Sequence, residues 1–260
     1  MKKIIALALA LCVLFAFASC GADDKKDSEY VKEKGTIVFG ITVFEPMDYQ
    51  EKGSEEWVGF DADMAKAFAA SLGVKAEFTV IDWDSKEQEL DGKTIDCVWN
   101  GMTLTDGVKA AMSCSNAYCN NAQVVVVPAD KADQFKTAEA CKSLKFAVED
   151  GSAGEDVARE NGYNVIEVAD QATALMEVAG GTADAAIIDL LMAGAMIGEG
   201  TSYANLTYTV KLNSEQYGVG FRKNSDLTAL LNEFFKTTYA DGTMKKIAEK
   251  YGTQESLIAQ

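Results

Sequence analysis

The chain has 260 residues, 48% of them hydrophobic and 25% charged, and its 40 Asp and Glu against 24 Lys and Arg give a formal net charge of -16. A chain of this length can bury a large core and is at the size where one lobe usually becomes two, while the acidic balance argues against nucleic acid as a partner. Because the sequence contains no His, imidazole triads and His metal sites are excluded, and we expect neither a metal nor a cofactor.

The first 19 residues have the layout of an export signal. Lys2 and Lys3 precede an apolar run over residues 4–17, and a small pair, Ala18-Ser19, leads into Cys20. A membrane-spanning helix is the alternative, but the run is short for one. The layout resembles a bacterial lipoprotein signal. It implies cleavage before Cys20, acylation of that thiol, and a lipid anchor that holds the protein to the membrane at the cell surface or in the periplasm.

Residues 20–34 are expected to form a flexible tether. This segment is charged, nearly free of apolar residues and without a helical or strand period. Such a segment cannot bury enough surface to offset the entropy of ordering it. The folded part of the chain is therefore expected to begin near residue 35.

From there the chain alternates between strand and helix patterns. The pattern predicts a strand over 36–40, a helix over 60–72 that stops at Gly73, and a strand over 74–80. A second series has strands over 124–127, 145–148, 165–168 and 185–188, and helices over 155–161 and 170–179. Because parallel strands need helical crossovers, the alternation predicts an α/β fold of open sheets that hold ligands at the carboxyl ends of their strands.

The stretch from residue 95 to 118 carries the first candidate binding groups. A short apolar run over 97–99 is closed by Asn100-Gly101, which is how a buried strand ends in an exposed loop. Thr103 and Thr105 then flank Leu104, so on an extended segment both hydroxyls project the same way. They can bind a small polar ligand, or they can serve as ordinary loop and helix-capping residues.

A series of short motifs in a fixed order is similar to the polar amino-acid solute-binding proteins of ABC importers. The resemblance covers residues 35–252, and an ordered series is more specific than any single motif. The motifs are Gly59-Phe60-Asp61-Ala62-Asp63, Asp82-Trp83-Asp84, Gly101-Met102-Thr103-Leu104-Thr105, Ser115-Asn116-Ala117-Tyr118, Gly151-Ser152-Ala153-Gly154-Glu155, Asp184-Ala185-Ala186-Ile187-Ile188-Asp189, Gly218-Val219-Gly220-Phe221-Arg222-Lys223 and Ala240-Asp241-Gly242-Thr243.

The resemblance implies the two-lobed type II periplasmic-binding-protein fold. Each lobe would be an open sheet flanked by helices, with lobe 1 formed by residues 35–127 and 215–260 and lobe 2 by residues 128–214. The chain would cross between the lobes at 123–127 and return at 216–220, and helices over 226–239 and 242–251 would complete lobe 1. Two crossings form a hinge, so the lobes can close on a ligand held between them.

The resemblance also assigns roles to individual residues. It implies that Phe44 and Trp83 sandwich the ligand's side chain, that Gly101 and Thr103 lie at the ligand, and that Asp189 pairs with an α-ammonium group. Structural roles are the alternatives: both aromatic rings can be core residues, and Asp189 can be the N-cap of a following helix.

The part of the site that would hold a ligand carboxylate departs from the family pattern. Val108 stands where the family has an arginine that binds a carboxylate through a bidentate fork, and Lys109 next to it cannot reproduce that fork. Ala153 stands where a threonine is common, which leaves Ser152, Thr103 and the amides of the following helix as donors. Glu149 adds negative charge beside them. With Asp189, this balance is expected to favour a cationic ligand and to disfavour glutamate or aspartate.

Four cysteines fall in the part of the chain that is expected to fold. Cys97 and Cys141 have the surroundings of small core residues. Cys114 and Cys119 form the most plausible disulfide, and free thiols are the equal alternative, because the sequence does not select among the pairings. Their spacing is not that of a zinc site.

The function that unites these features is an extracytoplasmic solute receptor. It would capture an amino acid or a related small amine and deliver it to an ABC permease with its ATPase, as a monomer held to the membrane by lipid. One alternative is a dehydratase-like enzyme on the same fold with Glu149 as general acid. Another is an extracellular sensor domain, which would need a membrane span and a cytoplasmic module.

Overall fold

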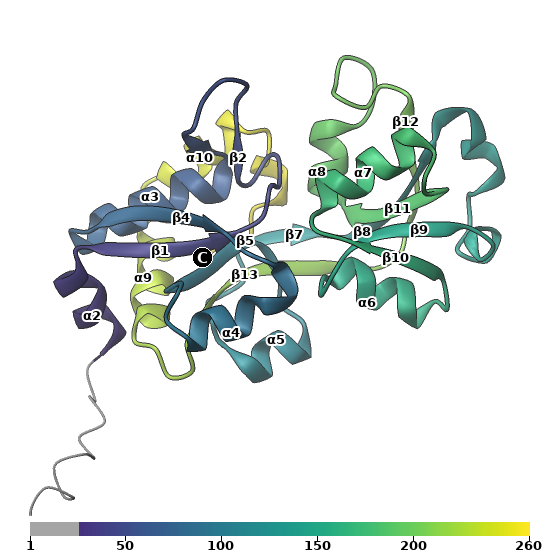
Figure 1. The fold of residues 1–260 in the computed structure, drawn as a ribbon. Helices are drawn as coiled ribbons and strands as arrows, with labels where there is room; N and C mark the ends of the chain where they lie inside the picture. The colour runs from purple at the N-terminus through teal and green to yellow at the C-terminus, as the bar shows by residue number, and fades with distance from the viewer. Residues whose placement is uncertain (1–25) are drawn as a thin grey trace, which may run out of the picture.

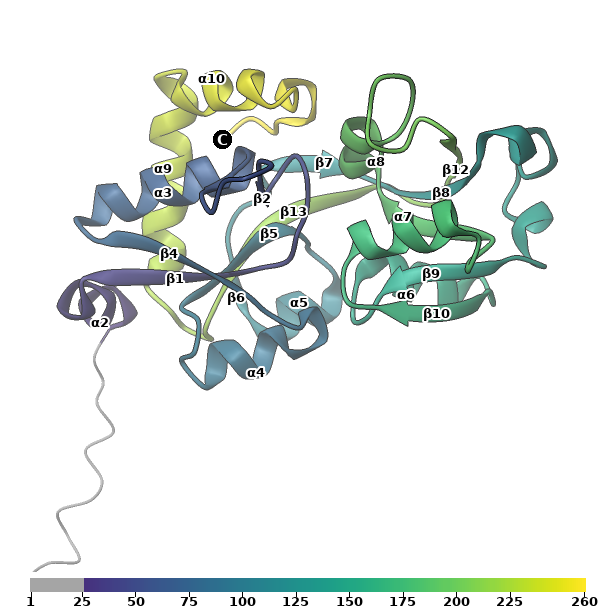
Figure 2. The ribbon, with the colours of Figure 1, turned by 45° about the horizontal axis from the view of Figure 1, so that its top comes forward.

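The computed structural model describes residues 26–260 as two lobes that lie side by side (Figures 1 and 2). The predicted export signal, the acylated Cys20 and the start of the predicted tether lie outside the described residues. Each lobe is built on one open sheet with helices on both faces, as expected for the type II binding-protein fold. Within residues 26–260, no helix combines the length and the apolar character needed to cross a membrane.

Lobe 1 contains a sheet in the order β4-β1-β5-β13-β6, with β7 also paired to β13. Its strands are β1 (Thr36–Ile41), β4 (Lys75–Val80), β5 (Cys97–Thr103), β6 (Ser113–Cys114), β7 (Cys119–Asn121) and β13 (Glu215–Phe221), and a small hairpin adds β2 (Tyr49–Gln50) and β3 (Trp57–Val58). β1 pairs in parallel with β4 and β5, whereas β13 is antiparallel to β5. The helices are α2 (Asp27–Lys34), α3 (Phe60–Leu72), α4 (Lys86–Asp91), α5 (Asp106–Ala111), α9 (Leu227–Ala240) and α10 (Thr243–Lys250), with short 3-10 turns η1 (Trp83–Ser85) and η4 (Gln254–Ser256).

Lobe 2 repeats this plan in the order β10-β9-β11-β8-β12. Its strands are β8 (Gln123–Pro128), β9 (Lys145–Glu149), β10 (Asn164–Val168), β11 (Ala185–Asp189) and β12 (Leu206–Lys211). Its helices are α6 (Ala153–Glu160), α7 (Gln171–Gly180) and α8 (Leu190–Met196), and 3-10 turns η2 (Ala129–Gln134) and η3 (Glu139–Cys141) follow β8. In Figure 1, α6 covers one face of the sheet, and α7 and α8 lie on the other.

The lobe boundaries differ from the predicted ones. Residues 123–127 were predicted to be a crossing at the end of lobe 1, but β8 pairs with β11 and β12 and so belongs to the sheet of lobe 2. The crossing is shorter, because Ala122 alone separates β7 from β8, and the return runs through residues 212–214. The apolar run from Val124 to Val127 is buried on both faces, which is typical of a central strand and not of a hinge.

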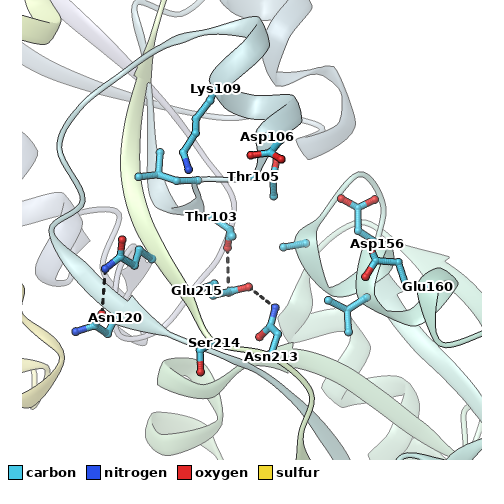
Figure 3. A pocket seen from close by; sticks show the side chains of 14 residues that line it. Thr103, Thr105, Asp106, Lys109, Asn120, Asp156, Glu160, Asn213, Ser214 and Glu215 are labelled. Atoms are coloured by element: carbon cyan, nitrogen blue, oxygen red, sulfur yellow. Dashed lines mark hydrogen bonds between the residues drawn. The ribbon is translucent and has the colours of Figure 1, made fainter.

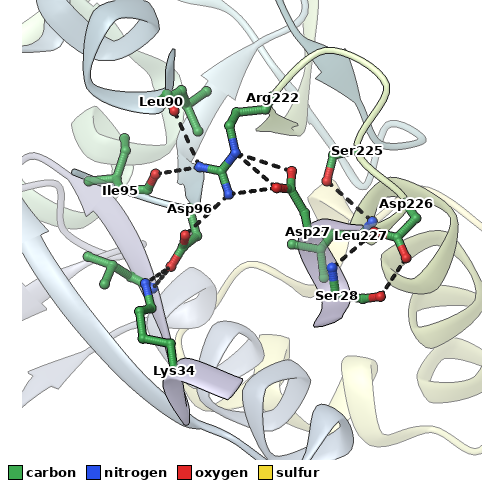
Figure 4. Close-up of polar contacts among 11 residues, drawn as sticks. Asp27, Ser28, Lys34, Leu90, Ile95, Asp96, Arg222, Ser225, Asp226 and Leu227 are labelled. Atoms are coloured by element: carbon green, nitrogen blue, oxygen red, sulfur yellow. Dashed lines mark hydrogen bonds and ion pairs between the residues drawn. The ribbon is translucent and has the colours of Figure 1, made fainter. Parts of the chain in front are cut away.

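Helix α2 contradicts the prediction of a flexible tether over residues 27–34. Val31 is fully buried, and Asp27 pairs with Arg222 from the end of β13 (Figure 4). Lys34 at the other end of the helix pairs with the buried Asp96. The segment looked too polar to fold because its partners are distant in the sequence, and these contacts offset the entropy of ordering it.

Trp99 is the centre of the core of lobe 1. Its ring is 1% exposed and lies 5.5 Å from the ring of Phe235, 6.1 Å from Phe39, 6.3 Å from Tyr118 and 6.4 Å from Phe68. These aromatic rings come from the sheet side of the lobe and from helices α3 and α9. The Trp99 ring therefore joins the sheet to both helices. The core therefore fixes β5, whose carboxyl end faces the other lobe.

The four described cysteines are unpaired. Cys97 and Cys141 are buried core residues, as predicted. Cys114 lies opposite Gly220 and Cys119 opposite Tyr217 on β13. Three residues along a strand span about 10 Å, which exceeds the roughly 7 Å that a disulfide allows between Cα atoms. Of the two alternatives for Cys114 and Cys119, the structure has the free thiols.

Candidate ligand-binding site

The carboxyl ends of β5, β9 and β11 meet between the lobes around a cavity of about 20 Å³. It is lined by Phe44, Trp83, Asn100, Gly101, Thr103, Glu149, Ser152, Ala153, Gln171 and Asp189. Seven of the eight predicted ligand-binding residues are therefore brought together, and only Val108 is not among them. A space of this size holds about one water molecule, so the lobes must separate before an amino acid can enter.

Asp189 is held by a set of donors from both lobes. Its Oδ1 accepts hydrogen bonds from the hydroxyl of Tyr217 at 2.5 Å, from Gln123 Nε2 at 3.2 Å and from Asn121, and its Oδ2 accepts one from Gln171. Asp189 occupies the N-cap position of α8, as the alternative expected, but its side chain makes no capping hydrogen bond there. Burial, followed by repulsion from Glu215, raises the pKa of the Asp189 carboxyl to about 7 despite these donors. Oδ2 retains an open acceptor position, because each carboxylate oxygen has two lone pairs.

Glu149 is a second buried carboxyl group at the same cavity. Only 3% of the residue is exposed, and its Oε1 has no hydrogen-bond partner among the described residues. Burial is the largest cause that raises its pKa to about 8, and the charges of Asp189 and Asp170 act in the same direction. Neither Glu149 nor Asp189 forms an ion pair with a lysine or arginine of residues 26–260. The cavity is therefore short of positive charge.

The raised pKa of Glu149 predicts how stability depends on pH. Between the ordinary value of 4.5 and about 8, the folded protein holds a proton that the unfolded chain has lost, so the free energy of unfolding falls as pH rises through this window. We expect Glu149→Gln to reduce this slope by up to about 1.4 kcal/mol per pH unit. Urea unfolding of the ligand-free protein at several pH values measures it. The exposed Glu139→Gln is the matched control, and an unchanged slope in Glu149→Gln would contradict the assignment.

Phe44 and Trp83 form the apolar part of the cavity wall, with 3% and 7% of their surfaces exposed. Phe44 packs edge-on against Tyr217, with 6.3 Å between ring centroids. Gly101 has a φ of 56°, and a Cβ atom there would lie 2.6 Å from the Phe44 ring, so only glycine fits. The buried carboxyl of Asp61 accepts a hydrogen bond from the Gly101 amide at 2.7 Å and holds this strand end in place.

Val108 lies beside this cavity, in a separate space of about 40 Å³. The space is lined by Trp83, Lys86, Met102, Thr103, Thr105, Val108, Gly151, Ala153 and Asp156. The Thr105 hydroxyl accepts a hydrogen bond from the Val108 amide and caps α5, and the Ser152 hydroxyl caps α6 by accepting one from the Glu155 amide. Both hydroxyls therefore have structural roles here, while Thr103 donates to Glu215 at 3.0 Å.

A wider cavity of about 700 Å³ opens on the hinge side of these spaces (Figure 3). It is lined by Thr103, Leu104, Thr105, Asp106, Lys109, Asn120, Ala153, Asp156, Val157, Glu160, Asn213, Ser214, Glu215 and Gln216. Four carboxylates and one lysine are among these residues, so the approach to the central cavity is acidic. Lys109, the neighbour of Val108 in sequence, lies here and is absent from the walls of both small spaces.

Glu215 joins the two crossings of the hinge. Its Oε1 accepts hydrogen bonds from Asn121 and Gln123, on either side of the first crossing, and its Oε2 accepts one from Asn213 on the second. The amides of Asn121 and Gln123 also donate to Asp189, so the hinge and the cavity share one network.

Sequence reasoning missed four polar residues of the site: Glu215, Gln171, Asn100 and Lys86. The positions of Asn100 and Gln171 give a signal, since polar residues at a strand end and at a helix start meet at the same sheet edge. Lys86 lies in a charged segment and Glu215 in a polar one; both segments resemble solvent-exposed surface, and nothing local distinguishes these two residues.

Comparison with known proteins agrees with this geometry. The family of bacterial extracellular solute-binding proteins, family 3, matches residues 37–254. The chain belongs to this family. The arginine-binding extracellular protein ArtP of Bacillus subtilis (strain 168) is 28% identical to this solute-binding protein over 261 residues, which cover 98% of this chain and 100% of ArtP.

Solved structures show the same two-lobed architecture. The substrate-binding protein of an ABC uptake transporter from Streptococcus pneumoniae, with bound histidine, gives a TM-score of 0.79 at 28% identity and covers 89% of this solute-binding protein and 98% of its own chain. An ancestral amino acid-binding protein, described as a precursor of cyclohexadienyl dehydratase, gives 0.78 at 31% identity, with coverage of 86% and 98%.

Proposed function

We propose that this solute-binding protein captures an amino acid with a basic side chain, or a related small amine, between its lobes and delivers it to an ABC permease. The observation that carries the proposal is the pair of buried carboxyl groups, Asp189 and Glu149, in one cavity without a cationic partner among the described residues. Burial disfavours the charged form of both groups and raises their pKa, and a ligand cation would supply the positive charge that stabilises this form. The similarity to ArtP and to the histidine-bound structure supports an amino acid as the ligand.

Thermal unfolding with a set of candidate ligands tests the proposal. Stabilisation follows the ratio of ligand concentration to dissociation constant, so lysine, arginine, glutamine and glutamate can be ranked at one concentration. We expect arginine and lysine to raise the unfolding temperature most and glutamate least, because the acidic cavity repels an extra carboxylate. Strong stabilisation by glutamate alone would overturn the proposed charge preference.

The two aromatic rings of the wall should contribute unequally to binding. Trp83 lines both small spaces, whereas the Phe44 ring also packs on Tyr217 and Gly101 within lobe 1. We expect Trp83→Ala to weaken binding of a basic amino acid more than Phe44→Ala does. The loss beyond buried area is about 0.5–1.5 kcal/mol for a stacked ring and larger for a cationic group. Isothermal calorimetry measures both, and wild-type affinity in Trp83→Ala would remove this ring from the site.

Attachment and delivery are further parts of the proposal. The signal layout before Cys20 supports lipid anchoring outside the cytoplasm, and family membership supports an ABC permease as partner. Mass spectrometry of the exported protein should show an acylated N-terminal cysteine. Co-purification of a permease from the native membrane, with and without ligand, tests delivery.

A dehydratase-like activity is the second candidate, and the protonation of Glu149 favours it. A carboxyl group with a pKa of about 8 keeps its proton at neutral pH and can act as a general acid. The likeness to the ancestral precursor of a dehydratase also supports it, although that protein is itself named as a binding protein. Incubation with hydroxylated ligands, followed by mass spectrometry, separates the two functions. Enzymatic product that disappears in Glu149→Gln would favour the enzyme.

A further inference from the structure

Lys86, the first residue of α4, is the only buried lysine among residues 26–260, with 7% of its surface exposed. Its Nζ donates to the carbonyl oxygen of Trp83 at 3.0 Å, within lobe 1, and to the carbonyl oxygen of Gly151 at 3.0 Å, in lobe 2. The ammonium group also lies 5.1 Å from the centre of the Trp83 ring. Three contacts therefore hold this charge at the boundary between the lobes.

No carboxylate of the described residues forms an ion pair with this ammonium group. Glu87, Asp84, Glu149 and Asp156 act on it only through longer-range attraction, and burial outweighs them, so the pKa of Lys86 is lowered. An ammonium group has three N–H donors, and the two carbonyl oxygens use two of them. One donor on a buried charge remains for another acceptor.

The space beside Lys86 is suited to an anionic group. Trp83, Thr103 and Ala153 line both this space and the cavity of Asp189 and Glu149, so the two spaces are neighbours. The first turn of α6 begins at Ala153, and its backbone amides add positive potential on the same side. The Lys86 end therefore combines an ammonium group and the α6 amides with one carboxylate, Asp156, whereas the other end holds the two carboxyl groups of Asp189 and Glu149.

We propose that Lys86 anchors the anionic group of the ligand, so that the bound molecule is a zwitterion with its carboxylate at Lys86 and an ammonium or guanidinium group at Asp189 and Glu149. This inference rests on the receptor function proposed above and narrows its ligand class to amino acids, to the exclusion of simple amines. Val108 presents no charge to this space, and Lys86 reaches it from α4, a different element. Because Lys86 also contacts Gly151, a carboxylate bound there favours the closed arrangement of the lobes.

A cycle of ligand and protein changes tests the anchor. Calorimetry would compare arginine with arginine amide, which lacks the carboxylate charge, on the wild type and on Lys86→Met. In the wild type, amidation should weaken binding by about 10- to 100-fold, the effect of a lost charge-assisted hydrogen bond. Arginine should bind to Lys86→Met about 10- to 100-fold more weakly than to the wild type. In this variant, replacing arginine by arginine amide should change the affinity by less than about 3-fold.

Control variants separate this role from a structural one. Lys86→Arg keeps the positive charge and should restore most of the sensitivity to amidation, and the exposed Lys75→Met should behave as the wild type. Unfolding temperatures of the ligand-free variants show whether Lys86→Met is folded, and Lys86→Gln is the second variant.

The outcomes distinguish the anchor from the receptor function. If amidation weakens binding equally in wild type and Lys86→Met, the anchor is rejected and the receptor function stands. The same rejection follows if Lys109→Met, and not Lys86→Met, abolishes the sensitivity to amidation. If the wild type binds none of the amino acids in the thermal screen, the receptor function and the anchor fail together.

Discussion

Replacing Asp189 by asparagine is expected to weaken binding of a basic amino acid by 2–5 kcal/mol, or roughly 30- to 5,000-fold. The substitution removes a buried negative charge, and the new amide group cannot accept hydrogen bonds through its nitrogen. Three donors, from Tyr217, Gln123 and Asn121, point at one oxygen of this carboxylate, so the side chain cannot simply rotate away. The ligand's cation would then face a neutral amide where it now meets a carboxyl group that can ionise.

Calorimetry at pH 8 measures the effect, with the exposed Asp130→Asn in the same lobe as the matched control. The wild type should also bind a cation more tightly as pH rises from 6 to 8, because the pKa of Asp189 is raised to about 7 and the cation prefers the ionised carboxylate. Asp189→Asn should lose part of this dependence. An affinity within 3-fold of wild type would show that the ligand's cation lies elsewhere.

Replacing Arg222 by methionine is expected to lower the free energy of unfolding by about 3–5 kcal/mol, because it removes the buried cation shared by Asp27 and Asp96 and leaves Lys34 as the remaining ion-pair partner of Asp96. Arg222 Nη2 lies 3.1 Å from Asp27 and 3.2 Å from Asp96, whose side chain is fully buried (Figure 4). Its Nη1 also donates to the carbonyl oxygens of Ile95 at 2.8 Å and Leu90 at 3.3 Å. The substitution removes these contacts from the core of lobe 1 and weakens the attachment of α2, which Ser28 and Lys34 still hold through Asp226 and Asp96.

Urea unfolding measures this loss, and hydrogen exchange should show faster exchange of the α2 amides. The chain offers a matched control, since it has only one other arginine. Arg159 pairs with the exposed Glu167 and with Glu155, whose side chain is 10% exposed, and the Arg159 side chain itself is 54% exposed. Arg159→Met should therefore change stability by about 0–1 kcal/mol. Equal losses in the two variants would contradict the role given to burial.

Local signals in the sequence were sufficient to predict most of the helices and strands. The helix predicted over 60–72 is α3, which ends at Gly73 in the left-handed conformation, and the helix predicted over 170–179 is α7, capped by Asp170. Apolar runs in the sequence correctly predicted the central strands of both sheets. These features depend on neighbours within a few residues, so caps, glycine stops and periodicity report them directly.

Most of the candidate site followed from the resemblance, because the motifs mark the ends of strands. Phe44, Trp83, Gly101, Thr103, Glu149, Ser152 and Asp189 do line one cavity. The sequence did not separate the structural roles of Ser152 and Thr105 from ligand contact, since a hydroxyl can cap a helix or bind a ligand with the same chemistry. Only the observed donors and acceptors distinguish the two.

The acidic composition, the alternating strands and helices, and the carboxylates at the strand ends were determined by the sequence alone, because each is a property of a short segment or of the whole count. The tertiary structure decided the rest. It ordered α2 through Arg222 and Asp96, placed β8 in the second lobe through its pairing with β11 and β12, and turned Glu215 into the link between the crossings. It also buried Lys86 against Gly151 of the other lobe. In each case the deciding partner lies tens of residues or more away along the chain, and a local pattern carries no information about such a contact.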